Sequence, residues 1–206
     1  MAGYLYILLL MIPSTSGITL TGSSTSATLD QSFQFTCTVT GPSNRNLLFF
    51  WEDDKTVCTI RLDRCQQHSA TPGYSCSCGQ SGVYHMDITS VSLTDDGTWT
   101  CTHSQTSNNV TLTVYYGPFN NVTVDKDSPV TVREDVTVSL TARCSAVCNP
   151  DCSYTWSKGT QQVSDNRDLP VGSFRRDQEG EYRCTARNTA TGATADSRTL
   201  TVNVQL

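Results

Sequence analysis

Charge and long apolar runs are scarce in this sequence. Only 16% of the 206 residues are charged, and the balance is acidic, with a net charge of −5 at pH 7. Because nucleic-acid-binding proteins need a basic surface, this balance argues against a nucleic-acid partner. It also leaves no polybasic patch for an anionic membrane. Beyond residue 16 the longest apolar run is Leu47–Trp51, which is far too short to span a bilayer.

The first 16 residues predict a cleaved secretory signal peptide. Tyr4–Ile12 is a short, uncharged apolar segment, and the small residues Ser14 and Ser16 suit cleavage before Gly17. A membrane anchor would need roughly 20 apolar residues, which this segment lacks. We therefore expect an extracellular chain, either secreted or the ectodomain of a membrane-anchored protein, with no membrane span within it.

The remaining chain is predicted to be all β and contains an internal repeat. No segment keeps the apolar period of a helix, and Ser, Thr and Val dominate stretches separated by Gly, Pro, Asn or Asp. Each copy has a cysteine, a tryptophan, a spaced apolar pattern and a final Gly-x-aromatic-x-Cys. The positions are Cys37, Trp51, Met86, Ile88, Val91, Gly97, Trp99 and Cys101, then Cys144, Trp156, Leu169, Val171, Phe174, Gly180, Tyr182 and Cys184.

This pattern resembles the immunoglobulin superfamily over nearly all of the chain beyond residue 16. The resemblance implies two tandem immunoglobulin-like β-sandwiches, with one disulfide across each core. The implied pairs are Cys37–Cys101 and Cys144–Cys184.

The spacing of these pairs implies two different domain types. A separation of 64 residues in the first copy suits a variable-like domain, which we place at residues 17–116. A separation of 40 residues in the second suits a shorter C2- or I-type domain, which we place at residues 117–206.

Two positions depart from the family pattern at the corner before the second cysteine of each copy. Trp99 stands where the family usually has tyrosine, so the hydrogen bond of that corner is in doubt in the first copy. Gln178 stands where the family usually has aspartate, which puts any charge pair from that corner in doubt in the second.

Six cysteines remain outside the family pairs. Because a secreted chain with an even number of cysteines forms disulfides, we expect all ten to be paired. Cys148 and Cys152 flank a turn sequence, Asn-Pro-Asp, so we expect a disulfide between them.

Four cysteines form a cluster between the two halves of the first copy. Cys76 and Cys78 are two residues apart in an extended stretch, which separates them by about 6.5 Å, near the upper limit for a disulfide. We therefore expect one of them to pair with Cys58 and the other with Cys65, in either combination. A zinc site is the alternative, but the spacings match no zinc-finger or ribbon pattern.

Catalytic and cofactor-binding motifs are not found, so we expect neither an enzyme nor a cofactor. His103 is expected to point inward. The acidic Glu52-Asp53-Asp54 is interpreted as a solvated turn rather than a calcium site, because it lacks the spacing of a calcium loop. Two sequons predict N-glycosylation at Asn109 and Asn121.

Strand alternation predicts a binding face on the first domain. If Trp51 faces the core, its neighbours of opposite parity face outward, together with threonines of two nearby strands. The predicted partner-binding residues are Leu48, Phe50, Glu52, Thr100, Thr102 and Thr113. Exposed apolar side chains grouped on one face often mark an interface.

These features favour an extracellular binding protein for cell adhesion or immune recognition, acting through protein–protein contacts of its N-terminal domain. The partner would be a cell-surface protein or a second copy of the chain. The alternative is a soluble immune-recognition molecule that binds microbial or glycan ligands. An enzyme's accessory module would require a catalytic domain beyond residue 206.

Overall fold

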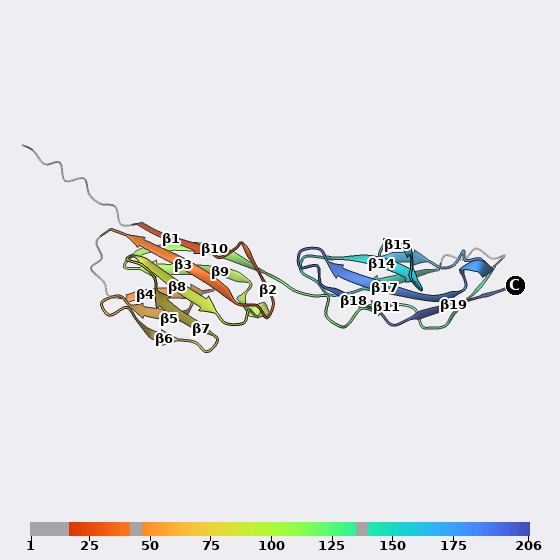
Figure 1. The fold of residues 1–206 in the computed structure, drawn as a ribbon, viewed down its shortest axis with the longest axis horizontal. Coiled ribbons are helices and arrows are strands. Elements are labelled where there is room, and N and C mark those ends of the chain that lie inside the picture. The colour runs from red at the N-terminus through yellow and green to blue at the C-terminus, as the bar shows by residue number, and fades with distance from the viewer. Residues whose placement is uncertain (1–16, 42–46, 135–139) are drawn as a thin grey trace, which may run out of the picture. The chain divides into compact units, whose positions relative to one another are not determined.

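The computed structural model describes residues 17–41, 47–134 and 140–206, which fold into two compact units (Figure 1). Unit 1 ends at Thr113 and unit 2 begins at Val114. Within the described ranges, no helix has the length and apolar character needed to cross a membrane. The expected signal peptide at residues 1–16 lies outside the described residues, and the expected boundary at residue 116 remains a prediction.

Unit 1 is a sandwich of two sheets. One has the strand order β1-β3-β8-β7 and the other β2-β10-β9-β4-β5-β6. The first sheet contains β1 (Gly17–Gly22), β3 (Phe33–Thr40), β8 (Val83–Ile88) and β7 (Tyr74–Cys78). The second contains β2 (Ser26–Thr28), β10 (Thr106–Tyr115), β9 (Gly97–His103), β4 (Leu47–Glu52), β5 (Lys55–Arg61) and β6 (Gln66–Ala70). A 3₁₀ turn, η1 (Leu93–Asp95), precedes β9.

Unit 2 is a second sandwich with a smaller first sheet. That sheet has the order β11-β13-β16, and the larger one has the order β12-β19-β17-β14-β15, with β18 also paired to β17. The small sheet contains β11 (Thr123–Val124), β13 (Thr141–Ser145) and β16 (Asp168–Pro170). The larger contains β12 (Val130–Arg133), β19 (Leu200–Gln205), β17 (Gly180–Asn188), β14 (Cys152–Lys158), β15 (Gln161–Ser164) and β18 (Thr194–Asp196). The turn η2 (Arg176–Gln178) precedes β17.

The repeated apolar positions form the two cores, as predicted. All six of the spaced residues between tryptophan and final cysteine are buried in their units: Met86, Ile88, Val91, Leu169, Val171 and Phe174. In each unit a disulfide joins the sheets through the middle of this core, Cys37–Cys101 in one and Cys144–Cys184 in the other. The all-β sandwich expected from the sequence is therefore confirmed for both units.

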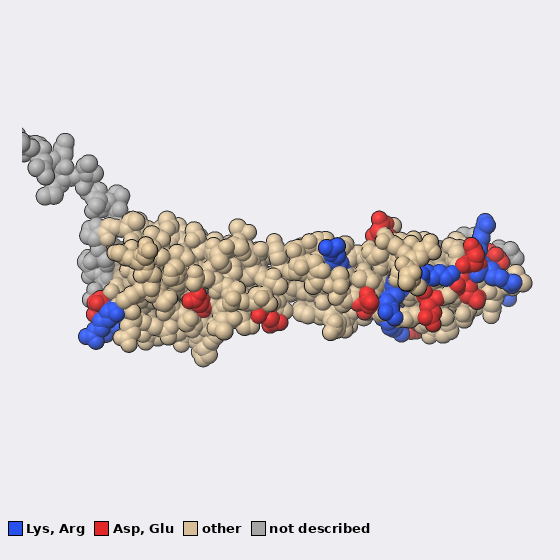
Figure 2. All heavy atoms as spheres, in the orientation of Figure 1, with Lys and Arg blue, Asp and Glu red and all other residues tan. Residues whose placement is uncertain are grey.

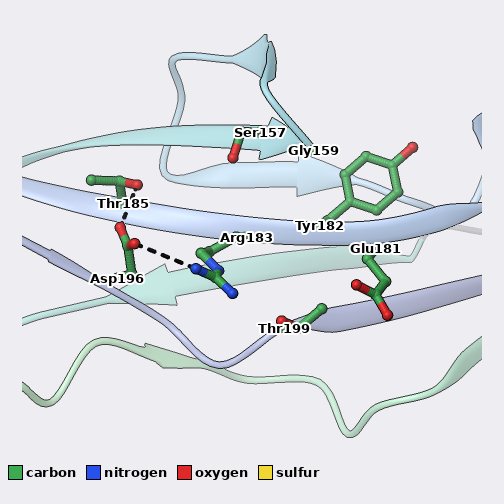
Figure 3. A pocket seen from close by; sticks show the side chains of 8 residues that line it. All are labelled: Ser157, Gly159, Glu181, Tyr182, Arg183, Thr185, Asp196 and Thr199. Carbon is green, nitrogen blue, oxygen red and sulfur yellow. Dashed lines mark hydrogen bonds and ion pairs between the residues drawn. The ribbon is translucent and has the colours of Figure 1, made fainter.

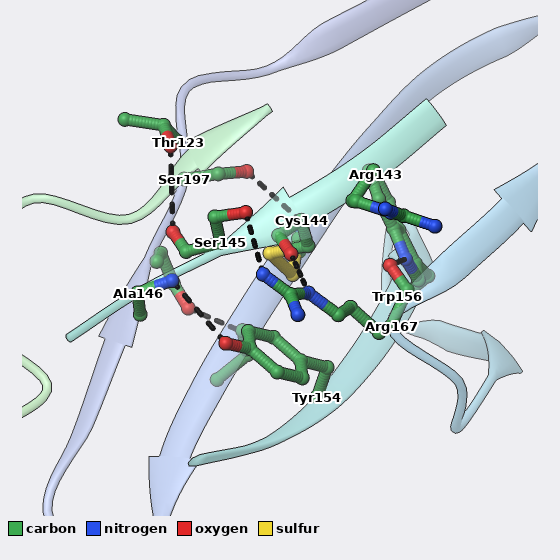
Figure 4. Close-up of a disulfide and its surroundings, with 12 residues drawn as sticks. Thr123, Arg143, Cys144, Ser145, Ala146, Tyr154, Trp156, Arg167 and Ser197 are labelled. Carbon is green, nitrogen blue, oxygen red and sulfur yellow. Dashed lines mark hydrogen bonds between the residues drawn. A yellow bond between two sulfur atoms is a disulfide. The ribbon is translucent and has the colours of Figure 1, made fainter. Parts of the chain in front are cut away.

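The surroundings of Cys144 show how unit 2 fixes its small sheet (Figure 4). Arg167 donates from Nε to the carbonyl of Cys144 at 2.9 Å and from Nη2 to the hydroxyl of Ser145 at 3.0 Å. The carbonyl of Arg167 accepts the indole N–H of Trp156, and its guanidinium lies 5.6 Å from the ring of Tyr154. One arginine thus ties β13 to the strand that carries the core tryptophan.

The corner before the final cysteine is built the same way in both units, although its residues differ. The indole Nε1 of Trp99 donates to the carbonyl of Asp95 at 3.0 Å, four residues earlier. In unit 2 the hydroxyl of Tyr182 donates to the carbonyl of Gln178, also four residues earlier. The doubt raised by Trp99 is therefore resolved, because the indole makes the corner bond that tyrosine makes elsewhere.

The cysteines pair as Cys37–Cys101, Cys58–Cys76, Cys65–Cys78, Cys144–Cys184 and Cys148–Cys152. This agrees with every expected pair and selects one of the two combinations left open. The four clustered cysteines are consumed by disulfides, so they are not free to act as thiolate ligands for zinc. Their two bridges join the β5–β6 hairpin to β7, and β6 and β7 are edge strands of opposite sheets.

The predicted orientation of β4 is wrong. Leu48 and Phe50, expected on the surface, are 0% and 1% exposed, whereas Trp51 is only partly buried. The physical reason is the register: Phe50 lies opposite Cys101 on β9, and Trp51 lies opposite Thr100. Residues directly opposite each other share a face, so Phe50 takes the core position beside the disulfide.

Candidate functional site

Because β4 is oriented opposite to the prediction, the apolar residues that it exposes are not the predicted ones. Leu47, Phe49 and Trp51 lie on the outer face of the large sheet of unit 1, and each is partly exposed. The rings of Phe49 and Trp51 are 6.0 Å apart between centroids. Two aromatic rings and a leucine on one strand therefore form an apolar row at the surface.

Threonines surround this row on the neighbouring strands. Thr100 lies opposite Trp51 and Thr102 lies opposite Phe49 on β9, while Thr59 of β5 lies opposite Phe49 on the other side. Thr100 and Thr102 are partly exposed and Thr59 is buried. We call Leu47, Phe49, Trp51, Thr59, Thr100 and Thr102 the aromatic face. Its members carry no charge, and the one charged neighbour on β5, Arg61, lies opposite Leu47 at the end of the row.

The predicted partner-binding residues are distributed between the two sides of the sheet. Thr100, Thr102 and Thr113 lie on the outer side as expected, Thr113 because it alternates with the buried Leu112 and Val114 on β10. Leu48 and Phe50 belong to the core. The sequence reasoning missed Phe49 and Trp51, and the only signal that identifies them is the pairing of β4 with β9.

Glu52 was also expected on the outer side, and the structure places it elsewhere. It lies opposite Trp99, which is a core position, and its Oε2 accepts a weak bond of 3.5 Å from the hydroxyl of Tyr74 on the other sheet. The same hydroxyl donates to Oδ1 of Asp95 at 2.6 Å. Asp95 is 1% exposed, and its Oδ2 also accepts the backbone N–H of Ser92 at 2.6 Å. Glu52 therefore points between the sheets, into an acidic corner.

Burial and the neighbouring carboxylate change the acidity of this corner. Desolvation, followed by the charge of Asp95, raises the pKa of Glu52 to about 7. Burial, followed by its hydrogen bond to Asp95, raises the pKa of Tyr74 above its usual range. Oε1 of Glu52 is buried and has no hydrogen-bond partner among the described residues. The ionised form of Glu52 is therefore poorly accommodated in the folded unit.

Asp53 and Asp54, the other acidic residues of that segment, make the turn between β4 and β5. Both have positive φ, 41° and 65°, as a two-residue hairpin turn with right-handed strand twist requires. Both are exposed, and Oδ1 of Asp53 accepts the backbone N–H of Thr98. Among the residues that the structure describes, no group of three acidic, histidine or cysteine side chains is arranged to hold a metal ion.

Charged side chains gather on unit 2 and are sparse on the visible side of unit 1 (Figure 2). A depression on unit 2 is lined by residues of β14, β17 and the β18 segment, among them the charged Glu181, Arg183 and Asp196 (Figure 3). There Arg183 approaches Asp196 at 3.7 Å, and the hydroxyl of Thr185 donates to Asp196 at 2.7 Å. Three of its lining residues, Arg183, Asp196 and Thr185, are thus bonded to one another.

The two predicted glycosylation sites are both exposed. Asn109 lies on β10 and Asn121 lies just before β11 in unit 2. His103 is buried, as expected, and its Nδ1 is 3.2 Å from the carbonyl of Leu47.

Comparison with known proteins agrees with the fold. Residues 118–204 match the family model described as immunoglobulin domain. The chain is 25% identical over 155 residues to the cell adhesion molecule CEACAM16 of Rattus norvegicus, covering 73% of this chain and 34% of that protein. It is 30% identical over 142 residues to neuronal growth regulator 1 of Gallus gallus, covering 66% and 39%. The chain therefore spans little more than a third of the length of the curated relatives it matches.

Solved structures extend this likeness to both units. The crystal structure of the first two immunoglobulin domains of DIP-gamma has a TM-score of 0.67 and 15% sequence identity, covering 88% of this chain and 93% of that one. At this identity the likeness concerns the fold alone. The match of residues 118–204 to the family model, together with the disulfide-bridged core and the corner that both units share, places the chain in the immunoglobulin superfamily, as a protein of two tandem immunoglobulin-like domains.

Proposed function

We propose that the chain is an extracellular binding protein for cell adhesion or cell-surface recognition, which contacts a protein partner through the aromatic face of unit 1. The observation that carries the proposal is the partly exposed apolar row Leu47, Phe49 and Trp51 on the outer face of the sheet, flanked by threonines of β9. Aromatic residues are enriched at protein interfaces, and grouped apolar residues on a soluble surface mark interaction sites.

Two further observations support this reading. Five disulfides within 206 residues indicate an oxidising compartment, which fits an extracellular site of action. The relatives named above carry the descriptions of a cell adhesion molecule and a neuronal growth regulator. The role is one of surface complementarity, without catalysis.

A bead-aggregation assay with the purified chain tests the proposal, with a second copy of the chain as the first probe. Phe49→Asp places a charge on the aromatic face. Thr38→Asp is the matched control, because Thr38 is partly exposed on the outer side of the opposite sheet. Aggregation that is lost with Phe49→Asp and kept with Thr38→Asp supports the face.

The same two variants then probe cells that display immunoglobulin-type adhesion ectodomains, which covers a heterophilic partner. Circular dichroism and thermal melting verify that both variants fold. Equal binding by the two variants contradicts the assignment of the face, and binding by neither the wild type nor any variant contradicts the adhesion role.

A further inference from the structure

The sequon at Asn109 lies on the same side of the sheet as the aromatic face. Asn109 on β10 is directly opposite Thr100 on β9, and Thr100 is directly opposite Trp51 on β4. Directly opposite residues point to the same side of a sheet, and neighbouring strands are about 4.8 Å apart. The Asn109 side chain therefore leaves the sheet about 10 Å from Trp51, with only a threonine between them.

The acceptor is accessible on this side. Asn109 and Thr111 are both exposed, and strand alternation places the asparagine amide and the threonine hydroxyl of the sequon on the same outer surface. The row that runs from Asn109 through Thr100 and Trp51 to Thr56 contains no charged residue. Nothing in this row repels an uncharged, hydroxyl-rich oligosaccharide.

We propose that an N-linked glycan on Asn109 lies over Trp51 and covers the β10 side of the aromatic face. In the modification, Nδ2 of Asn109 forms a bond to C1 of N-acetylglucosamine from a polyprenyl-diphosphate-linked oligosaccharide. The amide loses one proton and the polyprenyl diphosphate leaves. The carbon-bound hydrogens of a sugar ring form an apolar surface, which packs on the indole as other apolar groups do.

This arrangement divides the face. The glycan occupies the Trp51 end of the row on β4, and the other end of that row, with Leu47 and Phe49, stays open to a protein. The inference rests on the proposed function only in requiring that the chain passes through the secretory pathway. It does not require that a partner exists.

Tryptophan quenching tests the proposal directly, because all three tryptophans lie in described residues and only Trp51 is partly exposed. Trp99 and Trp156 are 1% and 0% exposed. Acrylamide quenching of the chain from eukaryotic cells therefore reports on Trp51. We compare the wild type with Thr111→Ala, which removes the sequon and keeps Asn109. Asn121→Gln is the matched control, since it removes the other sequon, in unit 2.

We expect peptide mapping to find Asn109 glycosylated, and the quenching constant to be roughly twofold lower in the wild type than in Thr111→Ala. The Asn121→Gln variant should match the wild type. Full occupancy at Asn109 with equal quenching in all three proteins would overturn the proposal. So would an unmodified Asn109 in a chain whose Asn121 is glycosylated. If neither sequon is modified in a chain expressed with its own leader, the extracellular function fails as well, which separates the two failures.

Discussion

Trp99 donates its indole N–H to the carbonyl of Asp95, and this bond fixes the corner that leads into β9. The indole is 1% exposed and stacks on Phe35 at 4.8 Å between ring centroids. Unit 1 thus has an indole at the position where unit 2 has the phenol of Tyr182, and both reach back four residues. The two units therefore place a side-chain donor at the same position and aim it at the corresponding backbone carbonyl, although one donor is an indole N–H and the other a phenol O–H.

Trp99→Phe should destabilise unit 1 because it leaves the carbonyl of Asp95 buried without its donor and opens a cavity. We expect a loss of roughly 2–4 kcal/mol in the free energy of unfolding of that unit. Tyr182→Phe is the milder counterpart in unit 2, where only the hydroxyl is removed, and it should cost about 1–2 kcal/mol. Hydrogen exchange read by mass spectrometry separates the two units. Equal protection in the wild type and Trp99→Phe would contradict the role of the corner bond.

The pKa of Glu52 makes unit 1 less stable as the pH rises. A folded carboxyl whose pKa is about 7, against 4.5 when exposed, holds more protons in the folded than in the unfolded chain between these values. Stability therefore falls as the pH rises from about 4.5 to about 7 and stays at the lower level above. Glu52→Gln should remove this fall and leave the unit more stable than the wild type at neutral pH. Urea unfolding of the wild type and Glu52→Gln at several pH values measures the free energy of unfolding that this prediction concerns.

Asp54→Asn is the control for this experiment. Asp54 is exposed in the adjoining turn at a positive φ that asparagine tolerates, so its substitution should leave the pH profile unchanged. A profile that is flat in the wild type, or that Asp54→Asn flattens as strongly as Glu52→Gln, would contradict the assignment to Glu52.

The orientation of β4 is tested by two adjacent leucines. Leu48→Asp buries a carboxylate in the core of unit 1 and should prevent folding or cost at least about 4 kcal/mol. Leu47→Asp, one residue earlier, points to solvent and should change the free energy of unfolding by less than about 1 kcal/mol. Thermal melting of the two variants decides between the two orientations, and the reverse order of stabilities would restore the opposite one.

The two disulfides of the cysteine cluster should differ in their contribution to stability. They close loops of similar length, with separations of 18 and 13 residues, so the entropic contribution is about 3 kcal/mol for each. Cys58 and Cys76 are 0% and 5% exposed, whereas Cys65 is exposed. Cys58→Ala with Cys76→Ala should therefore cost more than Cys65→Ala with Cys78→Ala, because it also leaves a cavity. Guanidinium unfolding compares the pairs, and equal losses would contradict the cavity contribution.

Much of the fold follows from the sequence because the repeat specifies it twice. The spacing of Met86, Ile88 and Val91 is repeated in the second copy, and each of these positions is buried. The two core disulfides follow from the same pattern, and Cys148–Cys152 follows from the turn between them, whereas the sequence leaves two pairings of the four clustered cysteines open. These features depend on local spacing, which a single sequence displays.

The aromatic face could not be placed in this way. The segment Leu47–Trp51 is apolar at five successive positions, so alternation carries no signal about which side is buried. The family pattern implies that the tryptophan after the first cysteine of each copy faces the core. Trp156 does so and lies opposite Cys184, whereas Trp51 lies opposite Thr100 on the outer face. In unit 1 the core contains the indole of Trp99, and Phe50 lies opposite Cys101, beside the disulfide. Only the register between distant strands distinguishes these cases.

The disulfides of unit 1 also have a mechanical consequence. Cys37–Cys101 encloses both bridges of the cysteine cluster, and its ends are 64 residues apart. If the unit is pulled by its two ends, the enclosed residues carry no load and cannot lengthen the chain. At about 3.5 Å per extended residue, the disulfide shortens the contour length of the unfolded unit by roughly 220 Å. Because the disulfide carries the force directly between Cys37 and Cys101, the strands outside the loop can unfold under load while β3 and β9 stay covalently joined.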